Sequence, residues 1–247
     1  MNKIKLALLA ALMLTLVACF PSNNTGKQEI LLQGSTMGTT YNIKVVATIE
    51  EVEALNLQQK IDATLKQVNQ EMSTYIKDSE ISQFNQSTST EPVDISVGFA
   101  RVLKESIRLG QLSGGKLDVT VGPLVNLWGF GPEQRPDKVP SDELLAATKK
   151  RVGLQNLVLE GNLLSKKIPD LYIDLSTTAK GYGVDVVAEL IENNGITNYL
   201  VEIGGELRLK GFKSTGELWA IAVEKPLTDE RSVQEVIIPR DNAVATS

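Results

Sequence analysis

A change in hydrophobic period near the start of the chain constrains its fold more than any other feature. Residues 34–41, GSTMGTTY, open a predicted first strand, in which apolar and polar residues alternate through residues 39–45. The spacing then becomes helical. The apolar residues of the next segment lie four, three and four positions apart: Ile61, Leu65, Val68 and Met72. Residues 50–72 are therefore predicted to form one amphipathic helix.

Later segments continue this mixture of periods. Helices are predicted at residues 97–109, with Gly110 as the stop, at 141–153, with Ser141 as the cap, and at 180–193. Strands are predicted at 157–160, 163–166, 171–175, 199–203, 219–223 and 233–238. The strand, helix and strand of residues 171–203 resemble a crossover, which would make its two strands parallel if they share a sheet. Because strands and helices do not alternate steadily, we predict the α+β class, with mixed sheets and packed helices.

The first residues have the pattern of an export signal. Lys3 and Lys5 precede an apolar run at residues 6–17, which is shorter than the roughly 20 residues that a membrane-spanning helix needs. The run closes on LVAC, which resembles the bacterial lipoprotein box. We therefore expect a signal peptide at residues 1–18, lipidation of Cys19, a tether at 19–30 and one folded domain at 31–247.

Composition narrows the possible functions. The net charge is −5, and no basic run is interleaved with aromatic residues, which argues against a nucleic-acid surface. Cys19 is the only cysteine, so the chain cannot form an internal disulfide. The chain also has no histidine, which removes the usual general base and the commonest transition-metal ligand. A bound metal is therefore expected to be a hard ion with oxygen ligands.

Four short stretches place glycine or hydroxyl residues beside charged residues at predicted element boundaries. They are GSTMGTTY at 34–41, GGKLDVTVGPLVNLWGFGP at 114–132, IDLSTTAKGYGVD at 173–185 and GGE at 204–206. The first is either a surface turn or a glycine lip that a ligand approaches closely. The third is either a plain helix cap after Asp174 or an anion site at a helix start, with Lys180 as the cation.

In this order and spacing, the four stretches resemble the FAD:protein FMN transferase family, the ApbE lipoproteins, over nearly all of the chain from Gly34 onward. The resemblance implies an ApbE-like fold and a periplasmic, membrane-anchored enzyme that binds FAD and Mg²⁺. Such an enzyme cleaves the FAD pyrophosphate and attaches FMN through its phosphate to a threonine of a target flavoprotein, releasing AMP. The implied target is an inner-membrane electron-transfer subunit, which favours the inner membrane for this protein.

The resemblance also assigns site residues. It places Met37 and Tyr75 beside the flavin, and these side chains suit a flat ring system. It implies further FAD contacts at Lys116, Leu117, Asp118, Asp174 and Lys180, and a Mg²⁺ ligand at Thr177. Without the resemblance, the two flavin residues would be read as ordinary core and the two aspartates as turn or cap carboxylates.

This sequence departs from the family pattern at its end. The family continues past a TSG motif, to which Thr246 and Ser247 correspond, into a histidine segment and further magnesium ligands. The domain at 31–247 is therefore expected to be truncated at its C-terminus, and no catalytic base is assigned. Two alternatives stay open: a Mg²⁺-dependent FAD pyrophosphatase that yields FMN and AMP, and a flavin-binding lipoprotein without catalysis.

Overall fold

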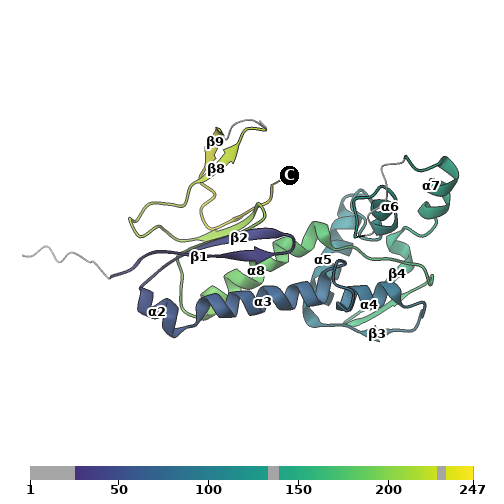
Figure 1. The fold of residues 1–247 in the computed structure, drawn as a ribbon, viewed down its shortest axis with the longest axis horizontal. Coiled ribbons are helices and arrows are strands. Elements are labelled where there is room, and N and C mark those ends of the chain that lie inside the picture. The colour runs from purple at the N-terminus through teal and green to yellow at the C-terminus, as the bar shows by residue number, and fades with distance from the viewer. Residues whose placement is uncertain (1–25, 133–138, 227–231, 247) are drawn as a thin grey trace, which may run out of the picture.

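The computed structural model describes residues 26–132, 139–226 and 232–246. An antiparallel sheet lies at one end of an elongated molecule, and a group of short helices and strands lies at the other (Figure 1). Two long helices, α3 (Leu57–Met72) and α8 (Ser176–Asn193), pack against the sheet. The predicted α+β class is confirmed. The predicted signal peptide and Cys19 lie outside the described residues, as does most of the tether.

The larger sheet has five strands in the order β1-β2-β6-β7-β10, and every neighbouring pair is antiparallel. Its strands are β1 (Gln28–Thr36), β2 (Thr39–Ala47), β6 (Tyr199–Ile203), β7 (Glu206–Lys210) and β10 (Ala243–Val244). The strands predicted at 39–45 and 199–203 are confirmed, whereas β1 and β7 were not predicted. Since β6 pairs with β2 and β7 and with no strand at 171–175, the predicted parallel crossover is wrong.

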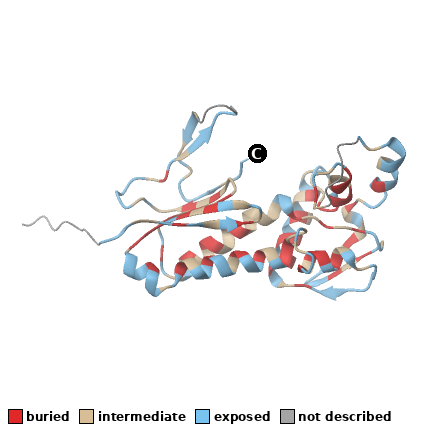
Figure 2. Cartoon of the chain, viewed as in Figure 1, coloured by how far each residue is buried: buried red, intermediate tan, exposed pale blue. Residues whose placement is uncertain are grey.

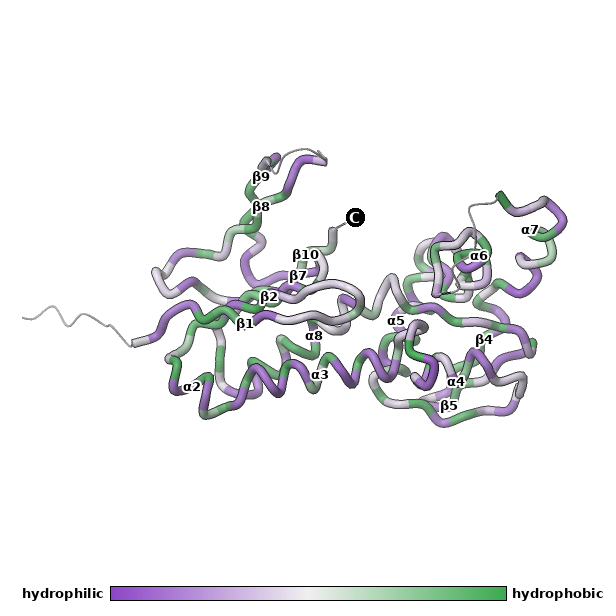
Figure 3. The backbone as a smooth tube through the Cα atoms, viewed as in Figure 1, coloured by the Kyte–Doolittle hydropathy of each residue, from purple (hydrophilic) through white to green (hydrophobic). Residues whose placement is uncertain are grey.

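One face of this sheet is buried by α3 and α8. The helices contribute Ile61, Leu65, Val184 and Val187, which pack on alternate residues of β2 and β6. Hydrophobic and hydrophilic residues alternate along α3, as its sequence period requires (Figure 3). On the opposite face, the indole of Trp219 packs with smaller apolar side chains and donates a hydrogen bond to the Lys210 carbonyl. Figure 2 shows this burial along the inner sides of α3, α8 and the sheet. We call this part the sheet region.

The predicted single helix at 50–72 is two helices. The first is α2 (Ile49–Ala54), which Thr48 caps through a reciprocal pair of hydrogen bonds with Glu51. The chain then turns at Asn56, whose φ of +48° is left-handed, before α3 begins. Asparagine tolerates this backbone conformation better than most residues, so the break occurs inside an otherwise continuous amphipathic pattern.

The other end of the molecule, which we call the distal region, has its own core and contains one helix as long as α3 together with many short elements. They are α4 (Glu80–Gln86), β3 (Val93–Asp94), α5 (Val97–Leu112), α6 (Gly122–Leu127), α7 (Asp142–Lys149), a 3-10 helix (Leu154–Asn156), β4 (Leu157–Glu160) and β5 (Leu163–Lys166). The predicted β4–β5 hairpin and the Ser141 cap of α7 are confirmed. Gly110 does not stop α5: it lies within the helix, where a side chain would collide with Leu154.

Residues 171–175 are the clearest failure of the sequence prediction. They do not form a strand, although Leu171, Ile173 and Leu175 are fully buried. The side chain of Asn85 takes the place of a neighbouring strand. Its amide donates to the Ile173 carbonyl and accepts from the Ile173 amide, at 2.8 Å each. The alternating apolar pattern therefore reports burial here and not membership of a sheet.

Smaller differences affect the remaining elements. Helix α8 begins at Ser176 and not at Lys180, and α7 ends at Lys149 and not near residue 153. The two predicted C-terminal strands are confirmed as an antiparallel pair, β8 (Ile221–Glu224) and β9 (Val233–Ile237). Within the described parts of the chain, no helix has the length and hydrophobicity needed to cross a membrane.

Candidate functional site

The octamer GSTMGTTY contains a tight hairpin turn. It covers the end of β1, the turn at Met37 and Gly38, and the start of β2, where Thr36 pairs with Thr39. Both turn residues have positive φ, +50° for Met37 and +72° for Gly38. Two-residue hairpins require this backbone, but asparagine or glycine usually occupies the first position. Methionine there is strained, which points to a function for its side chain.

The first glycine of the octamer has a packing role. A Cβ at Gly34 would lie 2.5 Å from the ring of Tyr41, its cross-strand partner. The contact with Tyr41 therefore accounts for the glycine at this position, and Gly34 is not among the residues that line the cavity described below. The side chain of Met37 instead reaches α8, where a Cβ on Gly183 would lie 2.8 Å from its terminal methyl group.

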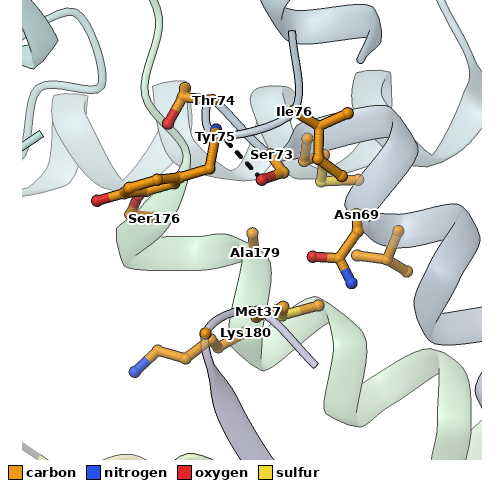
Figure 4. A pocket seen from close by; sticks show the side chains of 12 residues that line it. Met37, Asn69, Ser73, Thr74, Tyr75, Ile76, Ser176, Ala179 and Lys180 are labelled. Carbon is orange, nitrogen blue, oxygen red and sulfur yellow. Dashed lines mark hydrogen bonds between the residues drawn. The ribbon is translucent and has the colours of Figure 1, made fainter. Parts of the chain in front are cut away.

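A cavity of about 650 Å³ lies where the sheet region meets the distal region. Met37 packs against the sheet core, whereas Met72 and Ala179 belong to or pack against the distal core. The residues that line the cavity come from the hairpin tip, the end of α3, the loop after it and the first turns of α8. They are Met37, Gly38, Val68, Asn69, Met72, Ser73, Thr74, Tyr75, Ile76, Ser176, Ala179 and Lys180. Figure 4 shows Tyr75 on one side of this space and Met37 and Lys180 on the other.

The two residues expected beside a flavin both line this cavity. Met37 is partly buried and contributes to the core as well as to the cavity wall. Tyr75 is 67% exposed, so the alternative of an ordinary core residue is wrong for it. Ile76, Val68 and Ala179 make much of the remaining wall apolar. An apolar wall with an exposed aromatic ring suits a flat, largely apolar ligand.

The start of α8 adds a helix N-terminus and a cation to the lining of the cavity. Asp174 lies two residues before the first residue of the helix, and its carboxylate accepts from the Ser176 amide at 2.8 Å and from the Ser176 hydroxyl at 2.5 Å. Ser176 and Lys180 line the cavity, although Asp174 does not. Asp174 thus bonds to the first residue of α8, and a cation and a helix N-terminus line the cavity, an arrangement that would favour an anion.

The backbone at Asp118 runs beside the backbone at Asp174, and neither aspartate lines the cavity. Its carboxylate accepts from the Thr120 amide at 2.8 Å and from the Thr120 hydroxyl at 2.6 Å. Between these residues, the Val119 carbonyl accepts from the Asp174 amide at 2.8 Å. The second and third motifs are therefore joined, and the Asp118 carboxylate holds the turn that joins them.

Three other predicted site residues lie around this junction. Leu117 is half-buried against the distal core, and its amide donates to the Ser113 hydroxyl. Lys116 and Thr177 are exposed, with Thr177 in the first turn of α8. None of the three lines the cavity. Among the described residues, no group of three or more His, Cys, Asp or Glu residues could hold a metal ion.

The fourth motif, GGE at residues 204–206, contacts the first motif, GSTMGTTY at residues 34–41. Gly204 and Gly205 form the turn between β6 and β7, and a Cβ on Gly204 would lie 2.7 Å from Thr39. The Thr246 hydroxyl donates to the Gly205 carbonyl at 3.1 Å. A second hollow, lined by residues 35–40, shares Met37 and Gly38 with the cavity.

Sequence reasoning missed the wall residues Asn69 and Thr74, and it missed Gly183, which does not line the cavity but gives the Met37 side chain room against α8. The available signal was the position of STY directly after an amphipathic helix, which suggests that the last turn of that helix borders the same space. Asn69 lies within that turn, beside the predicted apolar position Val68. Nothing in the local sequence marks Gly183. A side chain is excluded at this position because Met37, which is distant in the chain, packs against it.

This arrangement defines an α+β protein with a nucleotide-sized cavity between a strained hairpin tip and a helix N-terminus. The model of the ApbE family matches residues 37–247. The chain is 58% identical to the FAD:protein FMN transferase of Vibrio cholerae over 220 residues, which are 89% of this chain and 66% of that protein. It is 48% identical to the enzyme of the same name from Haemophilus influenzae, over 96% of this chain and 69% of that protein.

Solved structures agree with the sequence relatives. The flavin transferase ApbE from Vibrio cholerae matches with a TM-score of 0.84 at 58% identity, over 90% of this chain and 72% of that one. The apo form of the flavinyl transferase ApbE from Pseudomonas stutzeri matches with a TM-score of 0.76 at 34% identity, over 80% and 66%. The chain belongs to the ApbE family of flavin transferases, which confirms the family predicted from its motifs. It spans about two thirds of the length of the curated relatives named above.

Proposed function

We propose that the protein containing this chain transfers FMN from FAD to a threonine hydroxyl of a target flavoprotein. The names of its relatives support flavin transfer from FAD to a protein. The observation in this chain that carries the proposal is a cavity with two kinds of lining: apolar and aromatic side chains, among them Tyr75 and Met37, and the start of a helix with a cation, at Ser176 and Lys180. FAD likewise combines a flat ring system with an anionic pyrophosphate.

The proposed reaction balances without a redox step. The threonine oxygen of the target attacks the phosphorus on the FMN side of the pyrophosphate. A new phosphoester bond forms, the bond from that phosphorus to the bridging oxygen breaks, and the bridging oxygen leaves with AMP. The hydroxyl proton passes to a base or to water. Lys180 and the first turn of α8 would attract the phosphates and hold them in place, because cations and helix N-termini favour anions.

We include Mg²⁺ in this proposal. Magnesium in proteins commonly keeps several waters and binds through one or two protein oxygens together with substrate phosphates. Thr177 would supply such an oxygen beside the residues assigned to the phosphates, and its exposure in the first turn of α8 is compatible with this role. When bound, the ion would neutralise charge that develops on the departing phosphate.

The proposed location follows from residues outside the described structure. The signal peptide at 1–18 and the lipidation of Cys19 would attach the protein to the outer face of the inner membrane, close to an electron-transfer target. The motif LVAC supports this proposal. Replacing Cys19 with Ser should release the protein into the periplasm or leave it unprocessed. A Cys19→Ser protein that stays processed and membrane-bound would contradict lipidation.

One assay separates the proposed activity from both alternatives. The protein is incubated with FAD, Mg²⁺ and a target flavoprotein domain, and the products are separated by mass. Covalent FMN on the target and an equal amount of AMP are expected. A matched target with valine at the acceptor position should stay unmodified. Free FMN with AMP would indicate a pyrophosphatase, and unchanged FAD would indicate a binding protein.

A further inference from the structure

Asn69 presents a single, fixed hydrogen-bonding group to the cavity. It lies in the last turns of α3 and is half-buried. Its side-chain NH₂ donates to the Leu65 carbonyl and to the Thr36 hydroxyl, at 2.8 Å each. Thr36 is the last residue of β1 and is itself buried. Asn69 is therefore held from two directions, by its own helix and by the strand that leads into the hairpin tip.

These two bonds fix which way round the amide lies. A backbone carbonyl only accepts hydrogen bonds, so the group that faces Leu65 must be the NH₂. Both of its hydrogens are then used. Among the described residues, no group donates to the Asn69 Oδ1 atom. Figure 4 shows this oxygen directed away from α3, toward Ala179 across the cavity.

The position thus selects for a ligand with a hydrogen-bond donor. An isoalloxazine ring has one N–H on its pyrimidine edge, at N3, between two carbonyl acceptors. We infer that Asn69 is a specificity-determining residue that accepts a hydrogen bond from the N3–H group of the flavin. This inference rests on the proposed flavin site and adds the orientation of the ring within it. With N3 toward Asn69, the pyrimidine edge lies against α3.

The inference distinguishes flavin from flat ligands that carry no hydrogen-bond donor. Adenine also carries a donor, its exocyclic amino group, so the ring that enters the cavity has to be identified by experiment. Two probes isolate the N3–H group without the rest of FAD. Lumiflavin has the intact pyrimidine edge, whereas 3-methyllumiflavin has a methyl group in place of that hydrogen. Neither probe carries phosphate, so Lys180 and α8 do not contribute a charge interaction.

Dissociation constants for both probes are measured by quenching of flavin fluorescence in the wild-type protein and in Asn69→Ala. In the wild type, methylation should weaken binding by about tenfold or more, because the bond is lost and the acceptor is left unpaired. In Asn69→Ala, the ratio between the probes should fall below about threefold, since the acceptor is absent. The wild-type comparison needs no variant, so it stands even if Asn69→Ala folds poorly.

The matched control is Thr64→Ala. Thr64 lies on the same helix and donates to a backbone carbonyl four residues earlier, as Asn69 does, but it does not line the cavity. It should keep the wild-type ratio. Equal binding of both probes by the wild type, an unchanged ratio in Asn69→Ala, or tighter binding of adenosine than of lumiflavin overturns the inference alone. Failure of lumiflavin to bind the wild type at all overturns the proposed flavin site as well.

Discussion

The sheet region and the distal region satisfy their backbones by different means. In the sheet region, the ladders between β1, β2, β6 and β7 pair the backbone groups, and α3 and α8 cover one face. In the distal region, the buried residues 171–175 belong to no ladder, and the side chains of Asn85 and Lys166 supply the partners of Ile173 and of the Leu171 carbonyl. In a ladder, the hydrogen bonds to buried backbone groups come from many residues. In the distal region, a few side chains provide them, so single substitutions should affect the stability of the two regions unequally.

Lys166 is the clearest example of one side chain that hydrogen-bonds several backbone groups. Its side chain is 2% exposed, and its ammonium donates to the carbonyls of Phe84, Ser87 and Leu171. Burial lowers the pKa of this lysine, yet three acceptors surround it. It thus connects the end of α4 to the segment that leads to Asp174. The candidate site lies between the two regions, so it depends on both kinds of support.

The largest predicted effect is that of Lys166→Met. The substitution should lower the free energy of unfolding by about 3 kcal/mol, because buried carbonyls lose their donor. Urea denaturation measures this loss. Hydrogen exchange should show protection lost first at residues 171–175 and retained in β2. Lys167→Met is the matched control, since Lys167 is exposed, and it should change stability by less than about 0.5 kcal/mol. Equal losses from the two variants would contradict the comparison.

The next effect is that of Asn85→Ala. This side chain alone pairs with both backbone groups of Ile173, so its loss should cost about 2 kcal/mol. It should also weaken FAD binding, because the segment that carries Asp174 to the start of α8 loses its support. Calorimetry on the same preparations tests both effects. Gln86→Ala removes a neighbouring exposed amide and should leave FAD affinity unchanged. Destabilisation without weaker binding would separate the segment from the site.

Tyr41 tests the sheet region. Its hydroxyl donates to Asp62 Oδ1 at 2.5 Å and accepts from Gln58 at 2.5 Å, while the ring covers Gly34. Tyr41→Phe should cost only about 1 kcal/mol at neutral pH, since the ladder and the ring contact remain. Hydrogen exchange should show no selective loss in β2. A loss as large as that of Lys166→Met would contradict distributed support.

The same residue gives a prediction about pH. Burial, with the nearby Asp62 carboxylate, raises the pKa of Tyr41 from 10.0 to about 12. A folded-state pKa above the unfolded value means that the stabilisation is complete below pH 10 and is lost as pH rises to about 12. The stability difference between the wild type and Tyr41→Phe should therefore shrink over this window. A difference that stays constant from pH 8 to pH 12 would refute the assignment.

The smallest effect on stability is expected at Met37, where the site meets the sheet. Met37→Asn introduces a residue preferred at this turn, so relief of the strained φ offsets the lost apolar contact, with a net change under about 1 kcal/mol. Lumiflavin binding should nevertheless fall by about tenfold, because one wall of the cavity is removed. Gly38→Ala is the converse control: it should destabilise the hairpin while leaving Met37 in place. Unchanged lumiflavin binding in Met37→Asn would remove Met37 from the site.

Periodic segments were predictable from the sequence because their structure does not depend on which particular residues they pack against. Alternation at residues 39–45 needs only another strand on each side, and the spacing of α3 needs only an apolar surface to cover. The four motifs also indicated the family, and the family resemblance assigned Met37, Tyr75 and Lys180 to the site. These three residues line the same cavity. Only the backbone preference of a single asparagine divided the predicted helix at 50–72, a local effect that hydrophobic period does not report.

Other features depended on tertiary contacts that have no local sequence signal. Residues 171–175 have the pattern of a strand, but Asn85, far away in the chain, supplies their partner. Lys166 shares the buried face of β5 with Leu164, and three carbonyls from distant parts of the chain converge on its ammonium. Asn69 gained its fixed orientation from the strand residue Thr36 as well as from its own helix. Local periods thus determined which faces are buried, whereas the convergence of distant polar groups, which the assembled fold alone creates, decided where the cavity and its hydrogen-bonding groups lie.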